Sequence, residues 1–379
     1  MAAGTLADGA SRAIDPDSKL VALDCFPAKL RLKKPVLGAA GKIEQVSVLY
    51  VRLKSANGTE GWGEAIADPS NTGETVAGMI AMIDVKLRAM ALGRSAYERV
   101  AIMASMKAGV FGNGGAMTAI DVALIDLVGK LRGIPAVEVL GGPKRAGVPI
   151  LAIVGSSGSA VDAFNEVKEG LDSGIRAFKL KVGCRSLQDD VKIIGEIRRV
   201  IGDGCFLAAD ANMAWDISTA VKFARAAVDE GLDYLEQPVA KDHHRMAMLA
   251  AQSPVPISGD ESIQGLNELL ALNDLKAIQG ASLKSIKLGG VTQAVRMAVI
   301  GDGLGLSIGV AMMMESGLAT SGMIHAACAV PQIDWFLNLG VDFLAEDPIN
   351  VGIIRNSGFA LCTGEPGLGV EVRVEQFRC

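Results

Sequence analysis

The stretch AFKLKVG, residues 177–183, has the composition of a short buried strand but carries two lysines, Lys179 and Lys181. Side chains two positions apart on a strand point to the same face, so the two ammonium groups lie together. Burying a charge without a partner is costly, and lysine is rarely found fully buried. The stretch therefore predicts a strand that ends in a polar site, where other side chains bind the two lysines.

This strand is one of a series that begins at about residue 147. Short apolar strands alternate there with amphipathic helices such as 187–202 and 218–231. We expect strands within residues 149–155, 177–183, 205–212, 233–238, 255–262, 281–290, 306–313 and 334–340. Eight strand–helix units is the number that closes a barrel of parallel strands. A doubly wound open sheet is the alternative, but no G-x-G-x-x-G motif follows the first strand.

The rest of the chain divides around this barrel domain, for which we expect residues 146–345. Residues 1–19 are small and polar and predict a disordered N-terminal extension. Residues 20–145 begin with alternating strands joined at a hairpin turn, Asn57-Gly58, and continue with helical periodicity, which predicts an α+β domain. Residues 346–379 have the pattern of a strand and turn that return to this first domain.

The composition excludes several classes of protein. Of 379 residues, 50% are hydrophobic and only 4% aromatic, and the net charge is −5, so neither a basic patch nor an aromatic platform suggests nucleic acid. No apolar run reaches the ~18 residues that span a bilayer, and the N-terminus lacks the features of a secretory signal. The six cysteines are scattered without a C-x-x-C pair, which favours free thiols in a reducing compartment. We therefore expect a cytoplasmic protein that binds neither nucleic acid nor membrane.

Polar residues recur at the carboxyl end of successive predicted strands. They are Lys179 and Lys181 in the second strand, Asp210 and Asn212 in the third, Glu236 in the fourth, Asp260 and Glu261 in the fifth, and Lys284 on the sixth. From Lys181 to Lys284 the steps from strand to strand are 29, 26, 24 and 24 residues, which is the length of one strand–helix unit. These side chains should therefore converge on one mouth of the barrel, where barrel enzymes keep their chemistry.

Three of these residues, Asp210, Glu236 and Asp260, are carboxylates on neighbouring strands. An all-oxygen set of ligands suits Mg²⁺ or Mn²⁺. Zinc is disfavoured because no cysteine or histidine lies at these positions. The alternative is that the carboxylates only cap the helices that follow them. Their shared phase, with lysines on both sides, favours a metal site.

The lysines suit acid/base chemistry, because they come from the second and sixth strands and flank the carboxylates. A lysine is a useful base only when its pKa falls toward neutrality, through burial or a nearby cation. The spacing of Lys287 from Lys284 suits a turn, so we expect Lys287 to be a supporting charge. His325 lies in the apolar run SGMIHAACAV and is expected to be a core residue.

Taken together, these residues resemble the enolase superfamily, and within it the muconate lactonizing enzyme subgroup. The resemblance is carried by KLKVG at 179–183, DAN at 210–212, EQP at 236–238, GDES at 259–262 and LKSIKLGG at 283–290, in the family's order and spacing. It covers nearly the whole chain from about residue 20. It implies a modified (β/α)7β TIM-like barrel with an α+β capping domain built from the N-terminal region and the C-terminal tail.

Carried over residue by residue, the resemblance implies a role for each member of the site. The ligands of Mg²⁺ become Asp210, Glu236 and Asp260, and the acid/base residues on the two faces of the substrate become Lys181 and Lys284. The resemblance also implies that Lys179 tunes Lys181. The remaining polar positions would support the site or contact the substrate: Asn212, Glu261, which would pair with Lys284, Glu315 and Asn338.

The chemistry that the resemblance implies is removal of a proton α to a carboxylate, with the metal holding the resulting enediolate. Racemisation or epimerisation, muconate-type cycloisomerisation, and dehydration of an acid sugar or hydroxy amino acid all share this step. Where dipeptide epimerases carry Asp-x-Asp on the eighth strand, this chain has Asn338-Leu339-Gly340. We therefore expect a homo-oligomeric isomerase of a small carboxylic acid without a free α-ammonium. A Schiff-base aldolase barrel and a non-catalytic binding protein are the alternatives from other classes.

Overall fold

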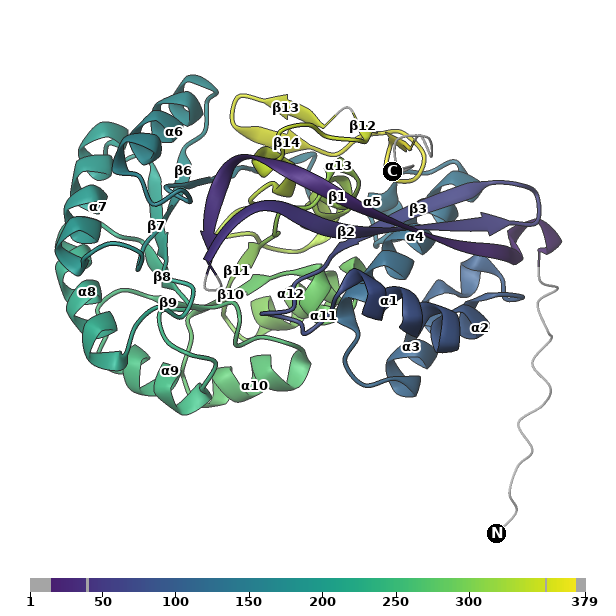
Figure 1. Cartoon of the computed structure of the whole chain (residues 1–379), viewed down its shortest axis with the longest axis horizontal. Helices are drawn as coiled ribbons and strands as arrows, with labels where there is room; N and C mark the ends of the chain where they lie inside the picture. The colour runs from purple at the N-terminus through teal and green to yellow at the C-terminus, as the bar shows by residue number, and fades with distance from the viewer. Residues whose placement is uncertain (1–14, 39–40, 352, 373–379) are drawn as a thin grey trace, which may run out of the picture.

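The chain folds into a capping domain and a barrel, with the barrel on the left of Figure 1 and most of the cap on the right. The computed structural model describes residues 15–38, 41–351 and 353–372. Most of the expected N-terminal extension, residues 1–14, lies outside the described residues. Residues 15–19 differ from the expected disorder, because Pro16–Ser18 form a capped turn of 3₁₀ helix.

The capping domain is an antiparallel sheet covered by helices. Its strands are β1 (Leu20–Gly38), β2 (Gly41–Ser55) and β3 (Glu60–Ile66), which pair in that order. The predicted hairpin turn joins β2 to β3, where the Gly58 amide donates to the Ser55 carbonyl at 2.9 Å. The helices are α1 (Val76–Met82), α2 (Arg88–Ala91), α3 (Arg99–Gly109), α4 (Gly114–Arg132) and α5 (Ala136–Val139), with a π-helical turn, Ile83–Leu87, between the first two.

Helix α4 packs so closely on β3 that the strand needs a residue without a side chain. A Cβ atom at Gly63 would lie 1.9 Å from the Ala119 carbonyl oxygen of α4. On another side of the helix, the Thr118 hydroxyl donates to the Ser285 carbonyl of the barrel at 2.8 Å. The long buried stretch of α4 is therefore explained by its place between the cap sheet and the barrel.

The barrel contains seven parallel strands whose order in the sheet follows their order in the chain. The strands are β5 (Leu151–Val154), β6 (Ala177–Lys181), β7 (Phe206–Asp210), β8 (Tyr234–Glu236), β9 (Ile257–Gly259), β10 (Gly280–Leu283) and β11 (Ser307–Val310). The helices are α6 (Ala160–Asp172), α7 (Leu187–Ile201), α8 (Ile217–Asp229), α9 (His243–Ala250), α10 (Leu266–Asp274), α11 (Ser285–Leu288), α12 (Val291–Gly303) and α13 (Gly317–Ala329). Figure 1 shows α6 to α10 as an outer wall around the strands.

Local sequence explains where the first helices of this wall begin. Ser159, Ser186 and Asp216 precede α6, α7 and α8, and each side chain accepts a hydrogen bond from an amide of the first helical turn. Such caps satisfy amides that have no partner within the helix. The three helices then bury one apolar face each, which is why their periodicity is visible in the sequence.

The predicted eighth strand, 334–340, is paired over a much shorter length than expected. Only Leu337 forms bridges there, to Ile150 on one side and to Val310 on the other, and these two bridges close the barrel. Phe336 has a positive φ of 61°, so the backbone leaves the extended conformation beside this residue. A turn of 3₁₀ helix follows in place of an eighth helix. The barrel is therefore of the (β/α)7β kind.

The C-terminal tail packs on both domains. Its described strands are β12 (Asn350–Val351), β13 (Ile354–Asn356), β14 (Phe359–Leu361) and β15 (Val370–Glu371). Strand β14 pairs with β4 (Gly147–Pro149), which leads into the barrel. Further along the tail, the Leu368 amide donates to the Asp126 carboxylate of α4 at 2.9 Å. The tail thus joins the barrel entrance to the cap.

In the described part of the chain, no helix is both long enough and apolar enough to cross a bilayer. The five cysteines that this part contains are free thiols. The sixth, Cys379, lies outside the described residues.

His325 lies in α13 and is buried, as the sequence predicted, and its Nδ1 atom accepts a hydrogen bond from the Val137 amide at 3.1 Å. Burial lowers the pKa of the imidazole to about 4, whereas an unfolded chain has a value of about 6.5. The folded state therefore holds the neutral ring. Its contribution to the free energy of unfolding is complete above about pH 6.5 and is lost as the pH falls toward about 4.

We expect this residue alone to lower the free energy of unfolding by up to about 3 kcal/mol as the pH falls through that range. Urea unfolding at several pH values, for the wild type and for His325→Gln, measures the effect. Glutamine can still accept from the Val137 amide but does not titrate, so the variant should lose less stability in acid. Equal slopes in the two proteins would contradict the buried neutral imidazole.

Candidate active site

The predicted site residues come from adjacent strands at one end of the barrel. Lys181 ends β6, Asp210 ends β7 and Glu236 ends β8, and the pairing register places the three side by side. Asp260 directly follows β9. The sequence predicted that Lys284 lies on the sixth strand. In the structure Lys284 directly follows that strand, β10, and precedes α11. In strand order, the lysines therefore flank the three carboxylates.

Each lysine that the sequence singled out is bound by a carboxylate, which explains how their charges are tolerated. The Nζ–O distances are 2.9 Å for Lys179 with Glu236, 2.6 Å for Lys181 with Asp210, and 2.5 Å for Lys284 with Asp260. All three carboxylates are buried. Removing either partner of a buried pair leaves an uncompensated charge, so these pairs depend on each other.

Ser282 and Met313 also belong to the site, although neither was predicted from the sequence. The Ser282 hydroxyl donates to Glu236 Oε2 at 2.6 Å. Ser282 comes two residues before Lys284, so the two-residue period of a strand was the signal that it points into the barrel. Met313 follows β11 and places its sulfur 3.4 Å from Lys284 Nζ. An uncharged methionine in an apolar run carries no comparable signal.

Lys287 supports the site directly, from within the protein interior. Its Nζ atom lies 2.5 Å from Asp260 Oδ1 and also donates to the Asp260 carbonyl. Asp260 therefore binds one lysine at each carboxylate oxygen, Lys287 at one and Lys284 at the other. Burial lowers the pKa of Lys287 on balance, although Asp260 opposes the shift.

Asn212 connects Lys181 to Glu261. Its Oδ1 atom accepts from Lys181 Nζ at 2.7 Å, and its Nδ2 atom donates to Glu261 Oε1 at 2.9 Å. We expected Glu261 to pair with Lys284. Glu261 instead binds Asn212, and among the described residues its other oxygen has no hydrogen-bond partner. Burial, followed by the charges of two neighbouring aspartates, raises the pKa of Glu261 to about 7.

The two remaining predicted residues lie near the end of β11 but are buried. Asn338 accepts from the Met312 amide at 3.0 Å and donates to the Met312 carbonyl at 3.2 Å. Its amide therefore holds the eighth-strand segment to the segment that follows β11. Glu315 is only 2% exposed. Burial, followed by the charge of Glu64, raises the pKa of Glu315 to about 8.

The carboxylates keep the two flanking lysines protonated in this structure. Burial opposes the charge on Lys181, but the charge and hydrogen bond of Asp210 together with the charge of Glu236 outweigh burial, and the pKa is raised. The same holds for Lys284, where burial is outweighed chiefly by Asp260, and the pKa is raised. A lysine with a raised pKa gives up a proton poorly at neutral pH and cannot accept one. A base function therefore requires that another cation take over the carboxylate charge.

The donor chemistry at this position suits such a cation. Over residues 15–38, 41–351 and 353–372, no group of three or more His, Cys, Asp or Glu side chains is already arranged to bind a metal ion. The carboxylates of Asp210, Glu236 and Asp260 each bind a lysine instead. The donors are nevertheless buried carboxylate oxygens from three adjacent strands, the ligand type that Mg²⁺ and Mn²⁺ prefer. The residues fit a hard divalent cation that replaces the lysine contacts.

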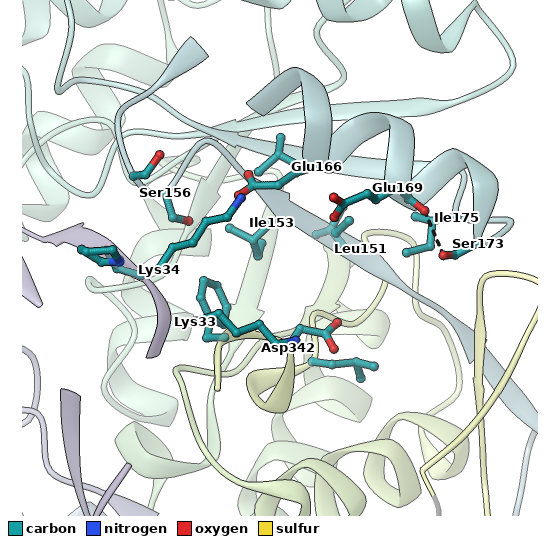
Figure 2. A pocket seen from close by; sticks show the side chains of 18 residues that line it. Lys33, Lys34, Leu151, Ile153, Ser156, Glu166, Glu169, Ser173, Ile175 and Asp342 are labelled. Atoms are coloured by element: carbon teal, nitrogen blue, oxygen red, sulfur yellow. Dashed lines mark hydrogen bonds and ion pairs between the residues drawn. The ribbon is translucent and has the colours of Figure 1, made fainter. Parts of the chain in front are cut away.

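A separate cavity of about 280 Å³ lies outside the barrel mouth. Figure 2 shows it between Glu166 and Glu169 of α6, Lys33 and Lys34 of β1, and Asp342, which follows the eighth-strand segment. The Nζ atom of Lys34 lies 3.3 Å from Glu166. The cavity borders β5 and α6, where a complete barrel would place its eighth helix. None of the site lysines or carboxylates lines it, so the cavity is separate from the site.

A barrel of parallel strands under an α+β cap, with lysines and carboxylates at the carboxyl ends of its strands, defines a class of barrel enzymes. Residues 22–141 match the family described as "Mandelate racemase / muconate lactonizing enzyme, N-terminal domain". Residues 162–376 match the family described as "Enolase C-terminal domain-like". The chain belongs to the enolase superfamily, in its muconate lactonizing enzyme subgroup.

Similar proteins of known activity are isomerases. Muconate cycloisomerase 1 of Pseudomonas putida is 30% identical over 324 residues, covering 84% of this chain and 86% of that protein. N-succinyl-L-Arg/Lys racemase of Bacillus cereus is 27% identical over 359 residues, covering 93% and 95%. The solved structure of muconate lactonizing enzyme from Pseudomonas fluorescens complexed with muconolactone superposes with a TM-score of 0.90 at 28% identity, covering 95% and 98%. The chain is therefore an isomerase of this superfamily.

Proposed function

We propose that this isomerase removes the proton α to a carboxylate of a small acid and then returns a proton, with Lys181 and Lys284 as the acid/base pair. The observation that carries the proposal is the order of the strands. Lys181 ends β6 and Lys284 follows β10, while the three carboxylates come from the strands between them. A substrate carboxylate held over the middle strands would have one lysine on each side of its α-carbon.

The carboxylates of Asp210, Glu236 and Asp260 would hold Mg²⁺, or Mn²⁺ in its place, and enzymes of this subgroup are generally Mg²⁺-dependent. A divalent cation supplies positive charge where the substrate carboxylate gains negative charge during proton removal. Asp210 and Asp260, once they bind a cation, would release the ammonium groups of Lys181 and Lys284. The pKa of both lysines would then fall toward the range of a base.

Other residues of the chain hold this pair in place and cover it. Asn212 fixes the Lys181 ammonium through its side-chain oxygen. The cap lies on the rim of the barrel, where the Leu37 amide donates to the Ser156 carbonyl at 2.8 Å. A second cap loop contacts the rim through Asn71 and Gln264, whose side chains are 3.1 Å apart. These contacts would exclude water from the reacting atoms.

For the substrate, we propose an N-blocked or cyclic amino acid that is racemised, or an unsaturated acid that is lactonised, over a dipeptide with a free amine. Dehydration is the alternative reaction on the same scaffold. The support is the eighth-strand segment, where the Asn338 amide is already bonded and Gly340 has no side chain. Asp342, the nearest acid in the sequence, binds Arg355. An α-ammonium there would lack the two aspartates that the dipeptide epimerase pattern supplies.

The test is a screen of carboxylic acids in D₂O with Mg²⁺, followed by NMR and chiral analysis. We expect deuterium at the α-carbon of N-acylated or cyclic amino acids, with kcat/KM at least about 10-fold higher than for free-amine dipeptides. If no acid exchanges its α-proton, or if borohydride traps a lysine adduct of the substrate, the proposed reaction is wrong. Efficient epimerisation of free-amine dipeptides would contradict only the proposed substrate class.

A further inference from the structure

Glu64 is a buried carboxyl group of the capping domain that bonds to the barrel. It lies on β3 and has no exposed surface. Its Oε1 atom accepts from the Ser316 amide at 2.8 Å, and its Oε2 atom lies 2.5 Å from the Ser316 hydroxyl and 3.2 Å from the Ala319 amide. These contacts cross from the cap sheet to the first turn of α13, 252 residues further along the chain.

The first turn of α13 is a junction of three parts of the protein. Glu64 comes from the cap, and Ser316 is the residue that caps the helix. Asp347 comes from the tail and accepts from the Gly317 amide at 3.2 Å. The first amides of a helix have no partners within the helix, so external acceptors determine where its first turn lies. Glu64 is the acceptor that reaches Ser316 from the cap.

Glu315 immediately precedes this junction and depends on it. A Cβ atom at Gly340 would lie 2.9 Å from the Glu315 amide nitrogen and 2.9 Å from its Oε2 atom, so the glycine leaves room for this carboxyl group. In the described part of the chain, Oε2 has no hydrogen-bond partner. Two residues before Glu315, the Met313 sulfur lies 3.4 Å from Lys284 Nζ, so this segment borders the lysine. The position of the backbone from Met313 to Ser316 therefore decides what lies beside Lys284.

We infer that Glu64 is a positioning residue: it holds the Glu315–Ser316 backbone so that the preceding Met313, whose sulfur lies 3.4 Å from Lys284 Nζ, stays beside the lysine when the cap is docked. The inference builds on the proposed acid/base role of Lys284. The cap would then position a residue beside Lys284 as well as cover the site. Proton transfer at Lys284 depends on a side chain whose place is set from the other domain, so an undocked cap leaves the lysine badly placed for reaction.

The experiment compares Glu64→Ala, which removes both acceptor oxygens, with Glu64→Gln, which keeps an acceptor for the Ser316 amide and a donor for its hydroxyl and loses only the acceptor for the Ala319 amide. We expect Glu64→Ala to lower kcat for α-deuterium exchange by about 10- to 100-fold, because small misplacements near a reacting group cost that much. KM should stay within about 3-fold, since Glu64 does not touch the substrate. Glu64→Gln should restore kcat to within about 3-fold of the wild type.

The matched control is Asp126→Asn. Asp126 is also a buried carboxylate, and it accepts from the Trp62 amide on the same strand β3 at 2.9 Å, but its other backbone partner, Leu368, is in the tail. This variant should lower Tm and leave kcat unchanged. Hydrogen exchange of the peptide around residues 313–320 should increase in Glu64→Ala and stay unchanged in Asp126→Asn.

The outcomes separate this inference from the proposed function. If the wild type exchanges the α-proton of no acid, the proposed function fails, and the hydrogen-exchange comparison still shows whether Glu64 holds this segment. If the wild type is active but Glu64→Ala loses only Tm, as Asp126→Asn does, the positioning role is wrong. Unchanged exchange of residues 313–320 in Glu64→Ala would overturn it as well.

Discussion

Replacing either Lys181 or Lys284 by alanine is expected to lower net racemisation by about 10²–10⁴-fold, the usual contribution of a general acid or base. Racemisation needs a base on one face of the α-carbon and an acid on the other, so losing either lysine stops it. Each variant should still exchange the α-proton of one enantiomer with D₂O. The enantiomer should be opposite in the two variants, because the lysines come from opposite sides of the carboxylate group.

The measurement follows α-deuteration of each pure enantiomer by NMR. Lys181→Arg is the matched control for charge, because arginine keeps a cation against Asp210 but does not act as a base at neutral pH. It should be as inactive as Lys181→Ala but closer to the wild type in Tm. If both alanine variants exchange the same enantiomer, the lysines do not act on opposite faces.

Asp210→Asn, Glu236→Gln and Asp260→Asn are expected to lower turnover by at least about 10²-fold each, because each removes a charge from the group proposed to hold Mg²⁺. Chelation by EDTA should abolish activity reversibly. Calorimetry of Mg²⁺ binding provides a readout that does not depend on turnover, and each variant should bind the cation more weakly than the wild type. Full activity in excess chelator would contradict the metal assignment.

Asp260→Asn should also be the least stable of the three without added metal. Asp260 binds both Lys284 and Lys287, so its neutralisation leaves two buried ammonium groups without a carboxylate. Breaking one buried pair costs about 3–5 kcal/mol. Thermal unfolding with and without Mg²⁺ separates this effect from the loss of the metal. A Tm equal to that of the wild type would show that solvent or other groups compensate for Asp260.

Much of the architecture could be predicted because its signals are local. Helices such as α7 begin after a capping residue, Ser186, and bury one face. The start of the helix and its hydrophobic period can therefore be predicted from neighbouring residues. The strands β5 to β11 are short apolar runs at regular spacing. Parallel strands in chain order place their carboxyl ends together, which is why residues as far apart as Lys181 and Lys284 could be assigned to one mouth of the barrel.

The place of the eighth strand was predicted, but its paired length could not be, because its sequence resembles that of the other strands. Its pairing is limited to Leu337, and Phe336 beside it takes a positive φ. A backbone conformation of this kind depends on what packs around the residue. Asn338 is a similar case. The sequence could not show that its side-chain oxygen and nitrogen bond to the Met312 amide and carbonyl.

Period and spacing along the chain were enough to predict the barrel, its cap and the set of lysines and carboxylates at the strand ends. Tertiary structure alone decided which of these groups bind each other: Lys179 with Glu236, Lys287 with Asp260, and Asn212 with Glu261. It also decided that Glu64 reaches Ser316 from another domain. Side-chain partners across strands and domains are set by distances of a few ångströms, and residue order along the chain does not encode such distances.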